Sequence, residues 1–158
     1  MYDEVTFLAG IMKPDFNEII KVLDNHKKYL SGDPDGEKAD FSHVDLYGQS
    51  LIGVNLKGAS LEGANLKRAL LCGANLEGAN LQGAFFKHAI LEGANLKGAQ
   101  LEGASLIGAN LERANLNGAN MKNADLENTS FHGSIYDKET IWPEYFDPEV
   151  KGSMFVND

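Results

Sequence analysis

The residue types that most often catalyse reactions or bind metals are few in this chain, and they are widely spaced. The four histidines are His26, His43, His88 and His132, and the single cysteine is Cys72. A zinc site needs three or four imidazole or thiolate ligands within a few ångströms, and a cysteine nucleophile needs a neighbouring base. The spacing of these residues indicates neither arrangement. We therefore expect no metal, no cofactor and no enzymatic activity, and we interpret Cys72 as an unreactive thiol.

Carboxylates and glycines are abundant, but their pattern indicates neither acid–base catalysis nor phosphate binding. The acidic side chains alternate with polar or basic residues, as on a solvated surface. The glycines recur at a fixed interval and never precede Lys-Ser or Lys-Thr, as they would in a phosphate-binding loop. The interval itself is therefore the most informative feature of the chain.

A large apolar residue, here called the centre, occurs at every fifth position from Phe41 to Tyr136. The residue two before the centre is alanine in fifteen of twenty units, and the residue two after it, here called the corner, is glycine in thirteen. The residue just before the centre, here called the polar position, is mainly Asn, Ser or Asp. A period of five fits neither an amphipathic helix nor an alternating strand, so it predicts a repeat architecture over residues 39–138.

These residue types suit an all-β solenoid whose interior is filled by the centres. A centre and the alanine two before it can face one interior if the residue between them points outward, as in a strand. Alanine lets neighbouring backbones approach, and glycine tolerates the positive φ of a tight turn. A short side chain at the polar position can bond to adjacent backbone or form stacked ladders.

The twenty units resemble the A(D/N)LXX motif of the pentapeptide repeat family, over about two thirds of the chain. The resemblance implies a right-handed quadrilateral parallel β-helix with four units per coil. Twenty units then give about five coils, which rise about 4.8 Å each and roughly 25 Å in all. It also implies that residues twenty apart stack and that residues five apart lie on adjacent faces.

The segments on either side of the repeats are expected to cover the two ends of the solenoid. Residues 1–38 contain a predicted amphipathic helix at about 14–31. Its apolar residues recur at near-helical spacing and are Phe16, Ile19, Ile20, Leu23 and Leu30. Residues 139–158 are rich in aromatic side chains and resemble the exit from the repeats in other family members. Because a solenoid end exposes unpaired backbone and apolar core, we expect both segments to be caps within one structural domain.

The charge of the chain limits its partners. It carries 14 basic and 23 acidic side chains, for a net charge of -9, and the acidity lies mostly in the terminal segments. This argues against direct binding of nucleic acid, which requires a cationic face. No apolar run approaches the roughly 18–20 residues of a membrane span, and the acidic start is unlike a signal peptide. A single cysteine cannot form an internal disulfide, and this also favours a cytoplasmic location.

Four polar positions hold large apolar residues instead, namely Leu70, Phe85, Ile90 and Ile135. Leu70 and Ile90 should stack on one face, beside the outward residues Ile52 and Cys72, and Phe85 should lie on the adjoining face. We define the apolar strip as Ile52, Leu70, Cys72, Phe85 and Ile90. Three interpretations are open: the N-terminal segment covers the strip, the fold merely tolerates it, or it contacts a protein partner or a second copy. Exposed apolar clusters rimmed by charge often mark such contacts.

The apolar residues of the C-terminal segment also allow two interpretations. We define the tail cluster as Ile141, Trp142, Tyr145, Phe146 and Phe155. It either caps the last coil or joins two copies end to end into a homodimer, as in gyrase-binding members of the family.

Two functions are compatible with these features. A rigid solenoid with regular outward side chains favours a noncatalytic structural or protein–protein interaction module with an unknown partner. The alternative comes from the resemblance, since some pentapeptide proteins are acidic dimeric rods that mimic DNA, occupy its site on DNA gyrase and protect against quinolones. The net charge favours this alternative. The nearly neutral repeats, with Lys67 and Lys87 stacked on one face, disfavour it, because a phosphate mimic requires continuous negative potential.

Overall fold

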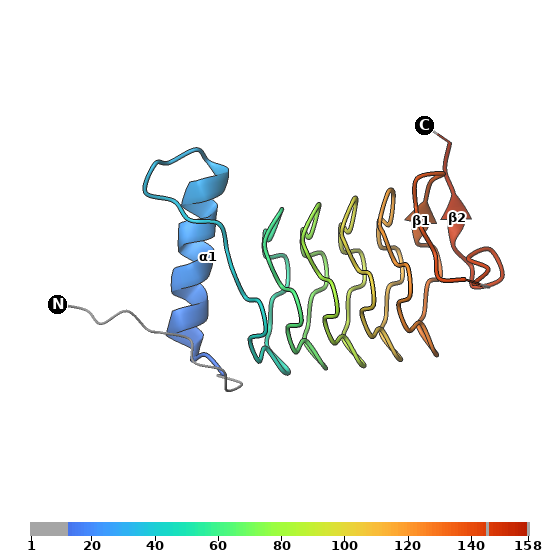
Figure 1. Cartoon of the computed structure of the whole chain (residues 1–158), viewed down its shortest axis with the longest axis horizontal. Coiled ribbons are helices and arrows are strands. Elements are labelled where there is room, and N and C mark those ends of the chain that lie inside the picture. Colours follow the sequence, from blue (N-terminus) through green and yellow to red (C-terminus); the bar gives the residue numbers. More distant parts are fainter. Residues whose placement is uncertain (1–12, 145, 158) are drawn as a thin grey trace.

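The structure is a computed structural model, and it describes residues 13–144 and 146–157. Helix α1 (Phe16–Leu30) stands at one end, a stack of coils follows, and strands β1 (Ile135–Tyr136) and β2 (Met154–Phe155) lie at the other end (Figure 1). The two strands pair in parallel. The repeats thus form a solenoid between a helical segment and the aromatic tail, and the prediction of a solenoid is confirmed.

Each turn of the solenoid takes twenty residues. Parallel bridges join polar positions twenty apart, from Asp40 with Ser60 to Asn115 with Ile135. The N–H of a centre donates to the carbonyl of the polar position one turn later, as Leu46 does to Asn65 at 2.8 Å, and Asn65 donates back to Val44 at 2.9 Å. Because a turn follows each centre, these bridges stay isolated and continuous strands are confined to β1 and β2 in the described residues.

A tight turn with positive φ follows almost every centre. All corners except Lys138 have φ between 55° and 68°. Glycine adopts this backbone freely, whereas His43, Arg68, His88 and Arg113 adopt it at a cost of roughly 1–2 kcal/mol each, because Cβ approaches the carbonyl. At four corners, therefore, a long side chain is present despite local backbone strain.

The interior consists of the centres and the alanines that precede them. Every centre from Leu46 to Met121 is at most 1% exposed, as is every alanine position from Ala59 to Ala119. Burying a large aliphatic or aromatic side chain completely contributes roughly 1.5–3 kcal/mol. Stability therefore comes from one continuous apolar column along the solenoid axis.

Side chains at the polar position cap the turns. The Oδ1 atom of Asn95 accepts the N–H of Lys97 at 3.2 Å, and its Nδ2 donates to Oδ1 of Asn75 at 3.2 Å in the neighbouring turn. The same capping contact occurs at Asp45 and Asn110. Among the described residues, no backbone carbonyl accepts the outward N–H of the residue after a centre, so a short acceptor two residues earlier is well placed to satisfy it.

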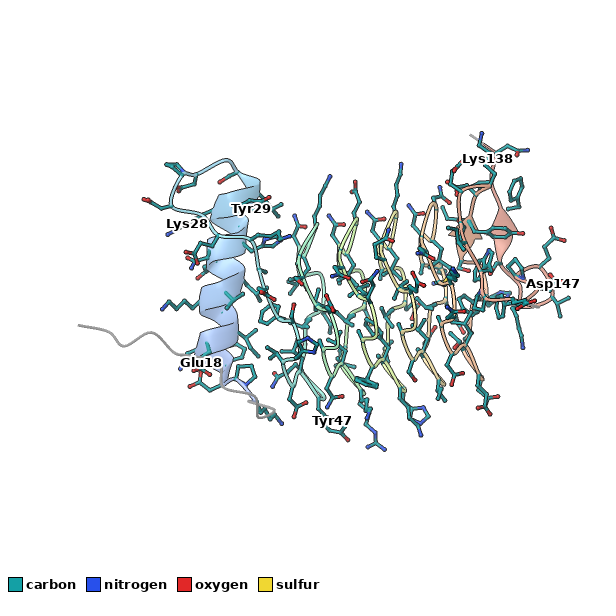
Figure 2. The ribbon with its side chains drawn as sticks, in the orientation of Figure 1. Glu18, Lys28, Tyr29, Tyr47, Lys138 and Asp147 are labelled. Atoms are coloured by element: carbon teal, nitrogen blue, oxygen red, sulfur yellow. The ribbon has the colours of Figure 1, made fainter. Side chains whose placement is uncertain are left out.

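Helix α1 packs against the first turn of the solenoid through Ile19, Val22 and Leu23 (Figure 1). It begins with a capping box, in which the Asp15 carboxylate accepts the N–H of Glu18 and the Glu18 carboxylate accepts the N–H of Asp15. Figure 2 shows Glu18 at the end of the helix where the chain enters it and Tyr29 at the opposite end. The helix therefore lies across the end of the solenoid.

The predicted apolar face of this helix differs from the observed one. Phe16, Ile20 and Leu30 belong to the predicted face, but they are 69%, 40% and 37% exposed. The helix touches the solenoid along one narrow side only. Val22 and His26 take part in that contact. The sequence spacing therefore predicted an apolar side of the helix that is rotated relative to the side in contact with the solenoid.

The twenty-residue period changes where the repeats end. Asn120 pairs with Ile141, which is one residue beyond the regular spacing. In the intervening turn, the Asp137 carboxylate accepts the N–H of Gly118 at 2.9 Å and the Thr140 hydroxyl at 3.1 Å. These bonds join the exit segment to the preceding turn and allow the extra residue. Within the described part of the chain, no helix is long and apolar enough to cross a membrane.

Candidate functional site

The residues that could perform chemistry lie apart from one another. In residues 13–144 and 146–157, no three His, Cys, Asp or Glu side chains gather as a metal site would require. His43 and His88 are exposed corners. The Cys72 thiol is half-buried, and its Sγ lies 4.0 Å from the carbonyl oxygen of Ile90. The candidate site in the described residues is therefore a surface rather than a reaction centre.

The apolar strip is brought together by the stacking of the turns. Leu70 and Ile90 form a parallel bridge, and the carbonyl of Cys72 accepts the N–H of Gly53 at 2.9 Å, which places Cys72 beside Ile52. Ile52, Phe85 and Ile90 are 56%, 43% and 37% exposed. Residues 13–38 pack at the end of the solenoid and leave these three side chains open, while residues 1–12 lie outside the described residues.

The turns of the strip also carry backbone N–H groups without an acceptor among the described residues, as do Glu62 and Glu102 on another face. Where Leu70, Phe85 and Ile90 replace Asn or Asp, the turn has no side chain that can accept the outward N–H two residues later. Those donors belong to Cys72, Lys87 and Glu92, and no described residue accepts them. The strip therefore presents backbone hydrogen-bond donors together with apolar side chains.

Cationic side chains border the strip. The Lys67 Nζ lies 5.1 Å from the centroid of the Phe85 ring, a cation–π contact that contributes about 0.5–1 kcal/mol at an exposed site. Arg68 and His88 occupy stacked corners between the two faces, each with a φ of 58°. Strained residues of this kind cluster at functional sites. The strip is thus an apolar surface with basic residues along one border and with Glu92 beside Cys72 in the next turn.

The tail cluster divides into a packed part and an exposed part. Trp142 meets Phe131 and Tyr136 edge to face, each at 5.5 Å, and stacks on Phe146 at 5.0 Å. Ile141 and Phe155 are 50% and 46% exposed. Tyr145, which belongs to the same predicted cluster, lies outside the described residues.

The environment of the packed part of the tail cluster also raises the pKa of a neighbouring tyrosine, Tyr136. Burial raises the pKa of Tyr136, and the carboxylates of Glu149 and Asp147 act in the same direction. The Tyr136 hydroxyl is therefore neutral at physiological pH.

Acids along the solenoid are interspersed with bases. Lys57 pairs with Glu77 at 3.1 Å, and Arg113 pairs with Glu92 at 3.4 Å. These exposed pairs contribute little to stability, but they interrupt any continuous row of negative charge.

One buried polar residue was missed by sequence reasoning. His26 is 0% exposed, its Nδ1 accepts the N–H of Ala39 at 3.1 Å, and its ring stacks on Tyr29 at 5.9 Å. Burial lowers the pKa of His26, the backbone of Lys57 opposes that shift, and the charge of Lys38 adds to it. Its position seven residues after Ile19 places it on the same side of the helix, and this spacing was the signal that could have identified it.

Comparison with known proteins gives a consistent picture. The family model described as "Pentapeptide repeats" matches in eight copies, over residues 39–78, 55–93, 73–106 and 94–133. None of the curated protein sequences matches the chain.

Several solved structures are similar. The pentapeptide repeat protein Rfr23 from the cyanobacterium Cyanothece 51142 is 39% identical, with a TM-score of 0.57, over 70% of this chain and 69% of its own. A pentapeptide repeat protein from the thylakoid lumen of Arabidopsis thaliana is 43% identical, with a TM-score of 0.54, over 56% of this chain and 61% of its own. Trypsin-treated QnrB1, a plasmid-mediated fluoroquinolone resistance protein, is 22% identical over 75% of this chain and 60% of its own, with a TM-score of 0.65, and shares the fold alone.

Proposed function

The chain belongs to the pentapeptide repeat family, and from this premise we propose that it is a noncatalytic module that binds another protein through the apolar strip. The observation that carries the proposal is the exposure of Ile52, which follows a centre, together with that of Phe85 and Ile90 at polar positions. The polar positions are hydrophilic elsewhere, except at Leu70 and Ile135. Complete burial of one such side chain contributes roughly 1.5–3 kcal/mol. A partner that covered the exposed part of all three would gain a few kcal/mol.

The surroundings of the strip support a protein as the partner. Unpaired backbone donors at Cys72, Lys87 and Glu92 suit a surface that offers carbonyl or carboxylate oxygens. The cationic rim supplied by Lys67 and Arg68 supports orientation of a partner, since charges at the edge of an interface affect encounter and register more than affinity. The strip itself is apolar and the net charge of the chain is -9, so nucleic acid suits this surface less well.

The proposal extends to details of the fold and to the cellular location. We infer a right-handed, four-sided β-helix of about five coils, supported by the twenty-residue bridging and by the turn after each centre. Helix α1 and the packed part of the tail cluster act as end caps, and the exposed Ile141 and Phe155 are the residues through which a homodimer would form. The lone Cys72 supports a cytoplasmic location.

DNA mimicry aimed at DNA gyrase is the second candidate, supported by the acidic net charge and by the fold shared with QnrB1. Two features disfavour it. Lys57 and Arg113 pair with acids along the solenoid, and Lys67 and Lys87 stack on one face. A phosphate mimic requires negative potential along its length.

Quantitative affinity capture tests the interaction module. Wild type is compared with a strip variant, Ile52→Asp with Ile90→Asp, and with a control that adds the same charge on another face, Asn55→Asp with Asn95→Asp. Wild type and control should capture the same specific protein in equal amounts. The strip variant should capture at least tenfold less of that protein. Equal retention by all three proteins, each shown to be folded by circular dichroism, would exclude the strip as the binding surface.

A further inference from the structure

The apolar strip begins in the first turn of the solenoid, next to the end that α1 covers. From Ile52 the strip extends over almost two further turns to Ile90, a rise of about 10 Å along the solenoid. Residues 13–38 pack at the end of the solenoid and leave its side chains at 52, 85 and 90 exposed. A further segment of chain that covered them would remove apolar surface from water, which is favourable.

The chain enters α1 on the side of the solenoid that carries the strip. Figure 2 shows Glu18, at the start of the helix, and Tyr47 along the same lower edge of the molecule, whereas Tyr29 lies at the upper end of the helix. His26, close to that upper end, lies against the backbone of Lys57, which is half a turn of the solenoid beyond Tyr47. The start of the helix therefore lies towards the corner that follows Tyr47.

That corner leads directly to the strip. Tyr47 is exposed, and the next residue, Gly48, donates its N–H to the carbonyl of Lys67 at 3.0 Å in the second turn. Lys67 in turn lies over the ring of Phe85 in the third turn. Arg68 occupies the same corner as Gly48, one turn later. An exposed path thus connects the start of α1 with the strip and passes two basic side chains.

The twelve residues before Lys13, which lie outside the described residues, have a composition that suits this path. Their sequence, MYDEVTFLAGIM, contains two acids, Asp3 and Glu4, and neither Lys nor Arg. Large apolar residues follow the acids, namely Val5, Phe7, Leu8, Ile11 and Met12. Twelve extended residues reach about 40 Å, which is several times the length of the strip. Both the length of the segment and the sign of its charge are therefore suitable.

We propose that residues 1–12 fold back onto the apolar strip and compete there with its protein partner, an inference that rests on the proposed function. The apolar side chains of the segment cover the exposed side chains of the strip, and its carboxylates lie near Lys67 and Arg68. Its backbone offers carbonyl oxygens to the N–H groups of the strip that have no acceptor among the described residues. Because the segment is tethered, its effective concentration at the strip is on the order of millimolar, so even a weak contact is populated.

The thiol of Cys72 measures this contact, because Cys72 is the single cysteine of the chain and belongs to the strip. The rate of labelling by a maleimide is recorded for the purified whole chain without a partner. Wild type is compared with a segment variant, Phe7→Ser with Leu8→Ser. The matched control is Val150→Ser with Met154→Ser, which removes two exposed apolar side chains at the other end of the solenoid (Figure 1).

Release of a segment that is docked in about nine of ten molecules raises access to the strip about tenfold. We therefore expect the segment variant to be labelled about tenfold faster than wild type, and the control at the wild-type rate, with all three proteins folded by circular dichroism. Equal rates in wild type and the segment variant, or the same increase in the control, would overturn the proposal.

A second measurement uses the wild-type segment itself. A photoreactive amino acid is placed at Phe85 or, as a control, at Asn95, two units further along the chain, and the purified protein is irradiated without a partner. An intrachain crosslink to residues 1–12 is expected from position 85 and not from position 95. No such crosslink from position 85, or an equal yield from both positions, would overturn the proposal.

Affinity capture then separates this inference from the proposed function. If the segment competes with the partner, the segment variant should capture more of the partner than wild type does, and equal capture would overturn the competition. If none of the proteins captures a partner while the segment variant is labelled faster at Cys72, the proposed function fails and the intrachain contact is supported.

Discussion

Replacement of Asn95 by alanine tests the role that the structure gives to the polar position. This side chain accepts the N–H of Lys97 at 3.2 Å and donates to Asn75 at 3.2 Å, so the variant loses two hydrogen bonds. Each intramolecular hydrogen bond contributes about 0.5–1.5 kcal/mol net, which gives roughly 1–3 kcal/mol for two. Because both groups are partly open to water, the expected loss is nearer to about 1–2 kcal/mol.

Ser105→Ala is the matched control. Ser105 also occupies a polar position, but its hydroxyl makes no hydrogen bond with a described residue. Its replacement should change the free energy of unfolding by less than about 0.5 kcal/mol, which is typical of surface sites.

Urea unfolding monitored by circular dichroism, analysed with a common slope, measures both variants. A loss of about 1–2 kcal/mol in Asn95→Ala corresponds to about 2–8 °C in melting temperature for a chain of this size. If the two variants lose the same amount of stability, the side chain does not cap the turn. The inference that the turns of the apolar strip lack a stabilising side-chain hydrogen bond to the outward N–H would then also fail.

The remaining predictions concern the core, the exit segment and the alternative function. Leu96→Lys places an unpaired charge in the apolar column and should cost several kcal/mol in thermal melts, whereas Glu102→Gln should cost no more than about 0.5 kcal/mol; comparable losses would mean that the inward and outward positions are misassigned. Burial opposes ionisation of Asp137, but hydrogen bonds from Gly118, Thr140 and Glu139 outweigh it and hold the pKa of this carboxyl below its ordinary value of 3.8. Its stabilising effect is thus present above pH 3.8 and is lost as the pH falls through the lower folded value. Amide protection at Gly118 should therefore decrease only in that acidic range in wild type, and already at pH 7 in Asp137→Ala, which removes the carboxylate acceptor. Unchanged protection in the variant would contradict this assignment. In a gyrase supercoiling assay, the protein should inhibit no more than a charge-matched acidic protein, and specific inhibition at micromolar concentration or below would instead favour DNA mimicry.

The arrangement of the repeats could be predicted because each unit repeats the same physical requirements. Ala59 and Leu61 are buried and the next corner, Gly63, has positive φ, as the five-residue pattern indicates. The stacking of Leu70 on Ile90 followed from the twenty-residue turn. Periodicity alone could not give the degree of exposure of these side chains, because that depends on what the terminal segments cover.

The terminal segments were less predictable because no repeat constrains them. The docked side of α1 is set by the shape of the solenoid end, so Ile19 is buried while Ile20 is exposed. The extra residue before Ile141 depends on hydrogen bonds of Asp137 to groups that are distant in the sequence. His26 was overlooked because a histidine on a helix is usually solvated, and only the contact with Ala39 shows its role.

Site-specific photocrosslinking in cells tests the central claim most directly. A photoreactive amino acid is placed at Ile90 in the apolar strip or at Asn95, the next polar position along the chain, on the adjoining face. We expect a crosslink to a distinct protein from position 90 and none to that protein from position 95. The same crosslinked products from both positions, or none from position 90, would contradict the assignment of the apolar strip as an interaction surface.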